Sequence, residues 1–212
     1  MNVVAVSDLH LLLHAASPGD LLTNAVRQKA PWLPCFLAEA DDVPAGPRPY
    51  HSGSVLAHTA RCMNQVAGDA LAVWMAMVHD AGKLSTPIAM WPHHYGHEDR
   101  GATLADIWAK ELGLSQAYAR AGHIAALLHM KAGRYSRLRP GKKYDLLHSV
   151  AESGFFRVFW LVVDADTKSD ISATATADWQ RVSALPEEDV EPEISRQRRI
   201  ALLTKSSTVT RP

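Results

Sequence analysis

Cysteine is scarce in this sequence of 212 residues, which contains only Cys35 and Cys62. Two cysteines cannot build the disulfide framework of a small secreted domain or a zinc site made of thiolates alone. No apolar run approaches the ~18 residues that a membrane-spanning helix needs, and the N-terminus lacks the pattern of a signal peptide. We therefore expect a protein of the reducing cytoplasm with no membrane partner.

Net charge is also absent, because 22 Lys and Arg residues balance 22 Asp and Glu residues. The lack of a global positive field argues against strong non-specific binding to nucleic acid, although it does not exclude a local basic patch. The hydrophobic fraction of 47% is enough for a sizeable core in one domain of ordinary size. The chain is rich in histidine, with eleven residues, most of them between His51 and His148. That clustering indicates a site.

The first residues contain a weak metal motif. Residues 3–10 can form a short strand and turn that ends in Asp8 and His10. This phrase is similar to the Asp-x-His motif of calcineurin-type metallophosphoesterases, but the rest of that family's signature is missing. We interpret residues 1–16 as a peripheral N-terminal segment, and the role of its Ser7-Asp8-Leu9-His10 phrase stays open.

Helical patterns follow in series, and no convincing alternating strand interrupts them. Residues 17–42 begin with a helix that Asp20 can cap, and two prolines interrupt it before a Pro- and Gly-rich loop at 41–49. The further helical segments are residues 54–68, 70–81, 98–112, 114–130, 143–152, 154–168 and 187–203. We predict one all-α domain over residues 17–203 and a disordered tail over 204–212.

The helix predicted at 70–81 ends in residues that suit a metal ion. Its apolar positions recur at helical spacing: Leu71, Trp74, Met75 and Val78. His79 and Asp80 follow on the last turn, and Gly82 occupies a position where helices commonly stop in a left-handed conformation. Neutral imidazole and carboxylate are ligands that borderline divalent cations accept. We therefore expect His79 and Asp80 to point into one cleft.

Other residues can complete such a site. His58 shares a helix face with apolar residues, so it is either a satisfied core histidine or a ligand. His129 ends the helix predicted at 114–130. Asp166 lies three residues after Val163 and matches the core stripe better than Asp164, the competing inward carboxylate. A buried carboxylate is costly unless it is paired or bound to metal.

The loop at residues 91–98 places three histidines and a glutamate within eight residues. Such a loop is either a solvated polar surface or part of a binding site. His97 and Glu98 open the following helix, where side-chain positions are well fixed.

The order His58, then His79-Asp80, then Asp166 resembles the HD-domain metal-dependent phosphohydrolases. The more detailed likeness is to the C-terminal HD domain of bacterial CCA-adding tRNA nucleotidyltransferases, over about residues 33–171. It rests on the phrases Tyr50-His51, Leu56-Ala-His58-Thr59, Val78-His79-Asp80-Ala-Gly82-Lys83, Thr86-Pro87, Trp91-Pro-His-His-Tyr-Gly-His-Glu98 and Ala165-Asp166. Nothing resembles the family's nucleotidyltransferase head, so CCA addition itself is not expected.

The resemblance implies an HD-domain helical bundle that binds a divalent cation: Mn, Ni, Mg, Fe or Zn. The implied metal ligands are His58, His79, Asp80, His97, His129 and Asp166. The first two histidines and the two aspartates suffice for one ion, and we favour a mononuclear resting site. His97 and His129 then either complete a second site or line the phosphate pocket.

The implied reaction is hydrolysis of phosphoester bonds in nucleotides or 2′,3′-cyclic phosphates by a metal-activated water. The implied catalytic residues are His79, Asp80, Lys83 and His129, and the implied substrate contacts are Lys83, His94 and Arg100. Lys83 is either a phosphate-binding point charge or a plain surface lysine. Substitution of His79 or Asp80 by alanine should abolish activity with little effect on the fold.

Two other interpretations compete with an enzyme. One is a non-catalytic HD module that binds tRNA or a nucleotide. The other is a metal-free helical interaction domain, which would have to treat six well-placed ligands as an accident. The expected partners are therefore a nucleotide or an RNA-end phosphate, with tRNA as a further candidate.

Overall fold

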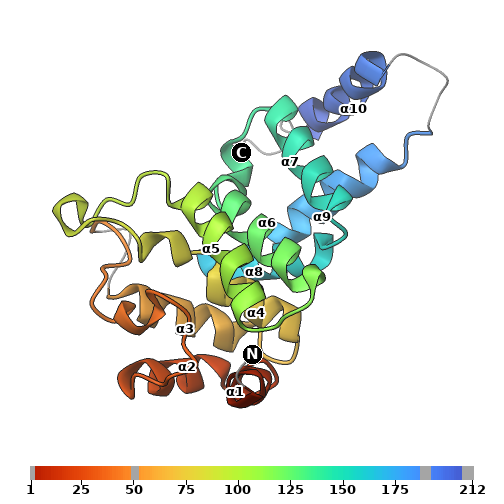
Figure 1. Cartoon of the computed structure of the whole chain (residues 1–212). Coiled ribbons are helices and arrows are strands. Elements are labelled where there is room, and N and C mark those ends of the chain that lie inside the picture. Colours follow the sequence, from red (N-terminus) through yellow and green to blue (C-terminus); the bar gives the residue numbers. More distant parts are fainter. Residues whose placement is uncertain (1–2, 49–52, 187–191, 207–212) are drawn as a thin grey trace.

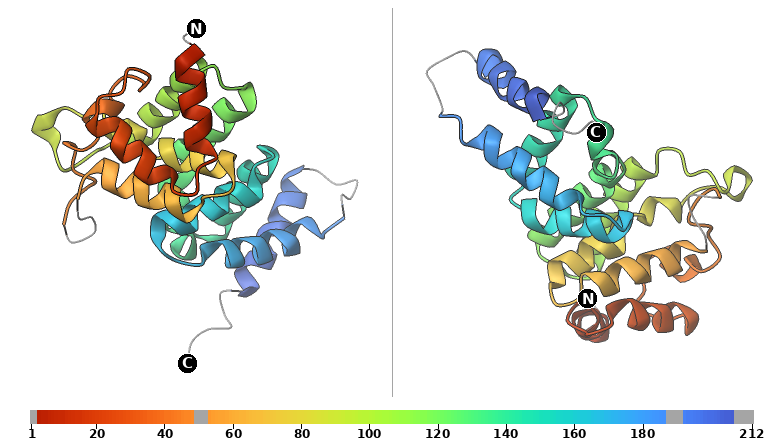
Figure 2. Two further views of the ribbon diagram at one scale, coloured as in Figure 1. Left: turned by 90° about the horizontal axis from the view of Figure 1, so that it is seen from below. Right: turned by 180° about the vertical axis from the view of Figure 1, so that it is seen from behind.

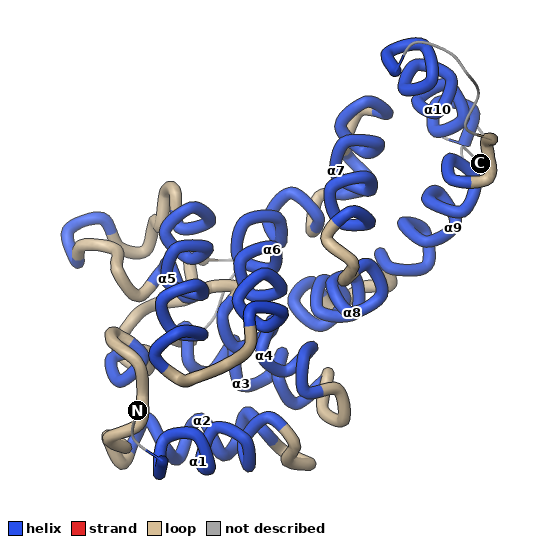
Figure 3. Tube along the Cα trace, turned by 45° about the vertical axis from the view of Figure 1, so that its right-hand side comes forward, coloured by secondary structure: helices blue, strands red, loops and turns tan. Residues whose placement is uncertain are grey.

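The computed structural model of the protein describes residues 3–48, 53–186 and 192–206. All regular structure in these ranges is helical, as Figure 3 shows, so the predicted all-α fold class is confirmed. The α-helices are α1 (Val3–Leu13), α2 (Pro18–Arg27), α3 (Val55–Gln65), α4 (Ala70–Val78), α5 (His97–Glu111), α6 (Gln116–Ala132), α7 (Pro140–Glu152), α8 (Phe156–Thr167), α9 (Ile171–Ser183) and α10 (Pro192–Ser206). Short 3-10 helices are η1 (Leu37–Glu39), η2 (Ala81–Lys83), η3 (Ile88–Met90) and η4 (Tyr135–Arg137).

Helix α4 is the buried centre of the molecule. Every residue from 72 to 78 is at most 2% exposed, as expected for a helix that is apolar on all sides. Helices α3, α6 and α8 pack around it, and α5 covers α6 and η2 (Figure 1). The indole of Trp74 donates from Nε1 to the backbone oxygen of Tyr118 at 2.8 Å, so its polar atom is satisfied inside the core. The end of α4 therefore lies where several helices meet.

Helices α7, α9 and α10 form a second layer that extends away from α1 and α2 (Figure 2). Helix α10 packs on α7 and α9, and α9 packs on α8. The phenol of Tyr135 donates to Asp178 Oδ2 at 2.8 Å, which ties η4 to α9 by a buried hydrogen bond. Helix α8 contacts α7 and α9 of this layer as well as α3 and α4.

The N-terminal segment is a helix, and the expected strand and turn are wrong. Helix α1 buries Leu9, Leu12 and Leu13 in the core, against α2 and α4. A short apolar run does not by itself distinguish a strand from a helix, and the spacing of these leucines favours the helix. His10 is exposed and stacks on His14 at a ring-centroid distance of 4.2 Å.

The structure corrects one local prediction, adds one helix and leaves one phrase untested. The N-cap of α2 is Ser17, with Pro18 in the first turn, so Asp20 lies inside the helix and accepts instead from Asn64 Nδ2 at 3.1 Å. Helix α9 was not predicted, because its sequence is mostly small and hydroxylated residues with a weak apolar stripe. The Tyr50-His51 phrase lies outside the described residues.

The sequence indicated that Gly82 ends α4 in a left-handed conformation, and this prediction is wrong. Gly82 lies inside η2, where the backbone meets the first turn of α5. A Cβ atom at Gly82 would be 1.9 Å from the backbone oxygen of His97, which no side chain can tolerate. Glycine is therefore required by close approach of two backbones, and that approach brings His97 beside Asp80. None of the described helices has the length and apolar character needed to cross a bilayer.

Candidate metal centre

The six predicted ligands come together in one cluster at the end of α4. They arrive from separate elements: His58 on α3, His79 and Asp80 between α4 and η2, His97 at the start of α5, His129 on α6 and Asp166 on α8. Their ligand atoms form two groups. We call them the His58 group (His58, Cys62, His79 and Asp166) and the His97 group (Asp80, His97 and His129).

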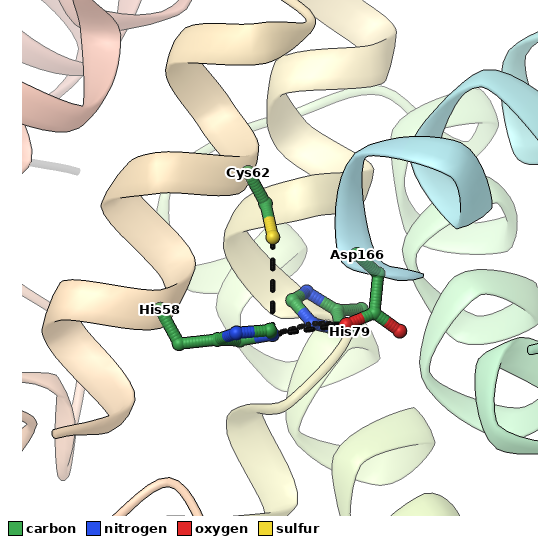
Figure 4. A group of neighbouring side chains, drawn as sticks. All are labelled: His58, Cys62, His79 and Asp166. Atoms are coloured by element: carbon green, nitrogen blue, oxygen red, sulfur yellow. Dashed lines mark hydrogen bonds and ion pairs between the residues drawn. The ribbon is translucent and has the colours of Figure 1, made fainter. Parts of the chain in front are cut away.

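The His58 group is shown in Figure 4. His58 Nε2 lies 3.1 Å from His79 Nε2 and 3.0 Å from Asp166 Oδ1. Cys62 Sγ lies 3.8 Å from the same nitrogen of His58. All four ligand atoms are within 4.8 Å of one another. Asp166 is the inward carboxylate, whereas Asp164 Oδ1 accepts from the backbone nitrogen of Ser172 at 3.0 Å and supports the start of α9.

The His97 group is fully buried. His97 Nε2 and His129 Nε2 are 3.3 Å apart, and Asp80 Oδ1 lies 3.6 Å from the first and 3.3 Å from the second. This arrangement again places two imidazole nitrogens and a carboxylate oxygen within 4.8 Å of one another.

Asp80 joins the two groups. Its Oδ2 lies 3.5 Å from both His58 Nε2 and His79 Nε2, while its Oδ1 faces His97 and His129. Oδ1 is buried and has no hydrogen-bond partner in the described part of the chain. A buried carboxylate oxygen without a partner is costly, and a cation between the ligand atoms would satisfy it. The donor set therefore fits a divalent metal, by the chemistry of its atoms and by this orphaned oxygen.

Backbone contacts orient three of the rings in the same way. In His79, His97 and His129, Nδ1 lies 2.7–2.8 Å from the carbonyl oxygen three residues earlier in the chain. A carbonyl oxygen only accepts, so Nδ1 must carry the hydrogen in each ring. The lone pair of a neutral ring then lies on Nε2 and points into the cluster. Metal-binding histidines are commonly fixed in this manner.

The electrostatics of the cluster divide the histidines into two kinds. Burial lowers the pKa of His79 to about 4, so this ring is neutral near pH 7. Burial also lowers the pKa of His58, but contacts with Asp166, Cys62 and Asp80 outweigh it and raise the pKa to about 10. For His129, burial likewise lowers the pKa, but the close approach and the charge of Asp80 outweigh it, so its pKa is raised. Protons on His58 and His129 therefore balance the carboxylates when no cation is bound.

Lys83 is buried, so its interpretation as a plain surface lysine is wrong. Its side chain is only 5% exposed, and Nζ donates to Asp80 Oδ2 and to the Ala45 carbonyl oxygen, both at 2.8 Å. Burial raises the pKa of Asp80, but Lys83, His79 and His129 together hold it well below its usual range. The ammonium therefore keeps Asp80 ionised, and its predicted contact with a substrate phosphate would have to use its remaining donor.

The other predicted substrate residues are His94, in the loop before α5, and Arg100, in the first turn of α5. His94 is buried, and its Nε2 lies 2.8 Å from the Pro44 carbonyl oxygen. Arg100 donates to the hydroxyls of Ser85 and Thr86, at 3.2 and 2.9 Å, and to the backbone of the same loop. These contacts show Arg100 bracing the loop. The structure does not bring either residue into the two ligand groups, and their contact with a substrate stays a prediction.

Sequence reasoning missed Arg61. Its guanidinium donates to the carbonyl oxygens of Ala165 and Asp166, at 2.6 and 3.1 Å, and lies 3.2 Å from His58 Nδ1. It therefore ties the ligand-bearing end of α8 to α3. The sequence feature that could have indicated this role is the position of Arg61 three residues after His58, which places both on one helix face.

A cavity of about 710 Å³ opens on the cluster. Its lining includes His58, His129 and Asp166 from the two groups, together with the cations Arg61, Arg134, Arg137 and Lys168. The last three are exposed, and no ion pair of theirs is found in the described part of the chain. The wall is strongly positive although the whole chain is neutral, which suits an anionic ligand such as phosphate.

An all-helical fold that gathers four imidazoles and two carboxylates beside a cationic cavity defines a candidate metal-binding domain for an anionic ligand. Comparison with known proteins agrees in part. The chain is similar to curated proteins named Multifunctional CCA protein. It is 35% identical over 92 residues to that of Legionella pneumophila (strain Lens), a stretch that covers 43% of this chain and 22% of the relative.

The other relatives show the same partial overlap. Identity is 32% over 129 residues to the protein of Nitrosococcus oceani, covering 58% of this chain and 32% of the relative. It is 38% over 80 residues to that of Xylella fastidiosa (strain M23), covering 38% and 19%. The chain thus matches a third or less of the length of these relatives, and the predicted resemblance to CCA proteins is confirmed over those stretches. No protein-family model and no solved structure matches the chain.

Proposed function

We propose that the protein is an HD-type metal-dependent phosphohydrolase, with residues 17–203 as the HD domain, that cleaves phosphoester bonds of nucleotides or of 2′,3′-cyclic phosphates. The observation that carries the proposal is the position of Asp80. Its carboxylate lies between four imidazole nitrogens, and one of its oxygens is buried without a hydrogen-bond partner in the described residues. The cationic cavity beside it and the named CCA relatives support the same proposal.

The ligands support two cation positions, one in the His58 group and one in the His97 group. The sequence favoured a mononuclear site, and the separation of the ligand atoms into two groups is the reason to propose two. A bound divalent cation would lower the pKa of a water toward neutrality and neutralise a phosphate oxygen. The candidate cations are those of Mn, Ni, Mg, Fe and Zn.

The chain's own residues prepare this chemistry. Lys83 keeps Asp80 ionised, and the backbone carbonyls hold the Nε2 atoms of three histidines toward the cluster. Arg61 fixes the end of α8, and with it Asp166. Arg134 and Arg137 line the cavity mouth and can donate to the non-bridging oxygens of a phosphate, which charge-assisted hydrogen bonds strengthen.

The test uses two aspartates that lie two residues apart on one helix. Hydrolysis of 2′,3′-cyclic AMP is measured with added Mn²⁺ or Ni²⁺, together with metal content, in wild type, Asp166→Asn and Asp164→Asn. Asp166→Asn should lose bound metal and lower turnover by about 100-fold, because an amide is a poor replacement for an anionic ligand. Asp164→Asn retains an oxygen for the Ser172 backbone and should behave as wild type.

Two results would contradict the proposal in different ways. Wild-type metal content and turnover in Asp166→Asn would remove the cluster from the reaction. Tight metal and nucleotide binding without any turnover in wild type would favour the non-catalytic module instead.

A further inference from the structure

We propose that Cys62 is a thiolate ligand in the His58 group, which makes this position a nitrogen, oxygen and sulfur site for Zn²⁺ or another thiophilic cation. The inference depends on the metal centre of the proposed function but not on the hydrolytic activity. It goes beyond the ligand set that the sequence indicated, because only histidines and aspartates were expected there.

The position of the sulfur supports ligation. Cys62 follows His58 by one helical turn on α3, so both side chains project from the same face. In Figure 4 the thiol points into the space shared by His58, His79 and Asp166. The separations of the ligand atoms are 3.0 and 3.1 Å from His58 Nε2 to the oxygen and the second nitrogen, and 3.8 Å to the sulfur.

Four of the six edges of this group are near those of a tetrahedral site, and the two from Cys62 Sγ to His79 and to Asp166 are within 4.8 Å. Zinc–nitrogen bonds of ~2.0–2.1 Å and a zinc–sulfur bond of ~2.3 Å give ligand–ligand edges of about 3.3 Å and about 3.6 Å. The observed edges from His58, and the 3.8 Å from His79 Nε2 to Asp166 Oδ1, differ from these by a few tenths of an ångström. Small rotations of the side chains would therefore bring all four atoms to bonding distance.

Asp80 Oδ2 is the competing fourth ligand, at 3.5 Å from His58 Nε2 and from His79 Nε2. This oxygen already accepts from the buried ammonium of Lys83 at 2.8 Å, while the other oxygen of Asp80 faces the His97 group. The sulfur has a much weaker partner, the Ala165 carbonyl oxygen at 3.7 Å. Of the two candidate ligand atoms, the sulfur loses the weaker hydrogen bond when it binds a cation. The sulfur is therefore the favoured fourth ligand.

Arg61 keeps the Ala165 carbonyl oxygen hydrogen-bonded when a cation replaces the thiol proton, which leaves to solvent. When the thiol becomes a thiolate, the Ala165 carbonyl oxygen loses its S–H donor but keeps the Arg61 guanidinium at 2.6 Å. No buried acceptor is left unsatisfied, and a positive charge stays near the sulfur. A thiolate ligand favours Zn²⁺, Co²⁺ or Fe²⁺, whereas Mg²⁺ prefers oxygen ligands.

The experiment loads the metal-free full-length protein with Co²⁺, which reports ligands by absorption. Wild type should show a thiolate-to-cobalt charge-transfer band in the near ultraviolet. Cys62→Ser should lose that band while still binding Co²⁺ through the remaining ligands. The control is Cys35→Ser, because Cys35 is exposed and its sulfur lies 3.4 Å from Trp108 Nε1, outside the ligand groups. This variant should keep the band.

A hydroxyl at a buried position can disturb packing, so Cys62→Ala is measured as well, with its far-ultraviolet spectrum as a check of folding. Both variants should weaken Zn²⁺ binding by about tenfold or more in competition with a chelator. Bound Co²⁺ without the band in wild type, or a band that survives in Cys62→Ser, would overturn the inference and leave the proposed metal centre intact. A charge-transfer band in wild type together with no turnover would overturn the proposed function alone. Absence of Co²⁺ binding in wild type would overturn both the proposed function and the inference about Cys62.

Discussion

His97 and His129 direct their Nε2 atoms at each other across 3.3 Å, while Nδ1 of each ring contacts a backbone carbonyl oxygen. With the hydrogen on Nδ1 in both rings, a neutral pair would place two lone pairs face to face. Only a proton or a cation between the two rings and Asp80 makes this arrangement favourable. The raised pKa of His129, where Asp80 outweighs the effect of burial, supplies that proton in the metal-free protein.

Metal affinity should therefore increase with pH. A cation must displace protons from His58 and His129, because an imidazolium cannot act as a ligand. Burial lowers the pKa of His58, but its contacts raise it to about 10, so protons compete with the metal throughout the neutral range. Calorimetry of Zn²⁺ binding in buffers of different ionisation enthalpy should show proton release. A binding enthalpy that is the same in every buffer near neutral pH would contradict this.

Asp80→Ala should destabilise the metal-free protein as well as abolish metal binding. The sequence suggested a fold largely intact, but the structure shows that Asp80 is the ion-pair partner of the buried Lys83. Removal of one member of a buried pair costs about 3–5 kcal/mol, because the other charge is left without compensation. Urea denaturation of the metal-free protein should show this loss. The double variant Asp80→Ala/Lys83→Met should recover much of it, and equal stability of single and double variants would exclude the ion-pair explanation.

Arg61→Gln should weaken metal binding by about 10–100-fold, the range seen when a residue that orients metal ligands is lost. The matched control is Arg157→Gln, on the exposed surface of α8, where the arginine pairs with Asp69 at 2.7 Å. An exposed pair contributes at most about 1 kcal/mol, and its loss should leave metal affinity unchanged. Competition titration with a fluorescent chelator measures both variants. Equal metal affinities in Arg61→Gln and Arg157→Gln would show that Arg61 does not position the His58 group.

Gly82→Ala should lower the free energy of unfolding by about 1–3 kcal/mol or more and separate His97 from Asp80. The added Cβ would meet the backbone of α5, which cannot yield as a side chain can. In Gly141→Ala, on α7, the nearest atom is the end of the Ile200 side chain on α10 at 3.7 Å, which is an ordinary contact. This control should be neutral or slightly stabilising, since alanine favours helices. Similar unfolding curves for both variants would argue against the close backbone approach.

The double variant Arg134→Ala/Arg137→Ala should raise KM for a phosphoester substrate by about tenfold, with kcat and metal content little changed. Both side chains line the cavity and contact no ligand atom in the described structure. Lys110→Ala/Arg120→Ala removes the same charge from exposed positions on α5 and α6 that do not line this cavity. Steady-state kinetics of the two double variants decide whether the effect is local. A KM that changes equally in both would indicate only a general effect of charge.

Local sequence patterns predicted the features of the site that depend on a single helix. The apolar stripe of α4 placed His79 and Asp80 at its buried end, and the helical phase of Asp166 placed it inward. The burial of Lys83 could not be predicted, because it depends on a loop carbonyl 38 residues earlier in the chain. The role of Arg61 depends in the same way on α8, which lies 104 residues away. Such contacts follow from the packing of whole helices, which no short pattern encodes.

The distance along the chain between α3 and α8, which the Arg61 bond to the Ala165 carbonyl spans, sets the order in which the His58 group is assembled during synthesis. Helix α3 leaves the ribosome with His58 long before α8 exists, and Asp166 is the last of the ligands to be made. Until then the nascent chain presents imidazoles without the Asp166 carboxylate that completes the His58 group, and the Arg61 guanidinium lacks its carbonyl partners on α8. Stable capture of a cation in that group would therefore be a late event in biosynthesis, and a bound metal there would mark a chain whose helices α3 to α8 have folded together.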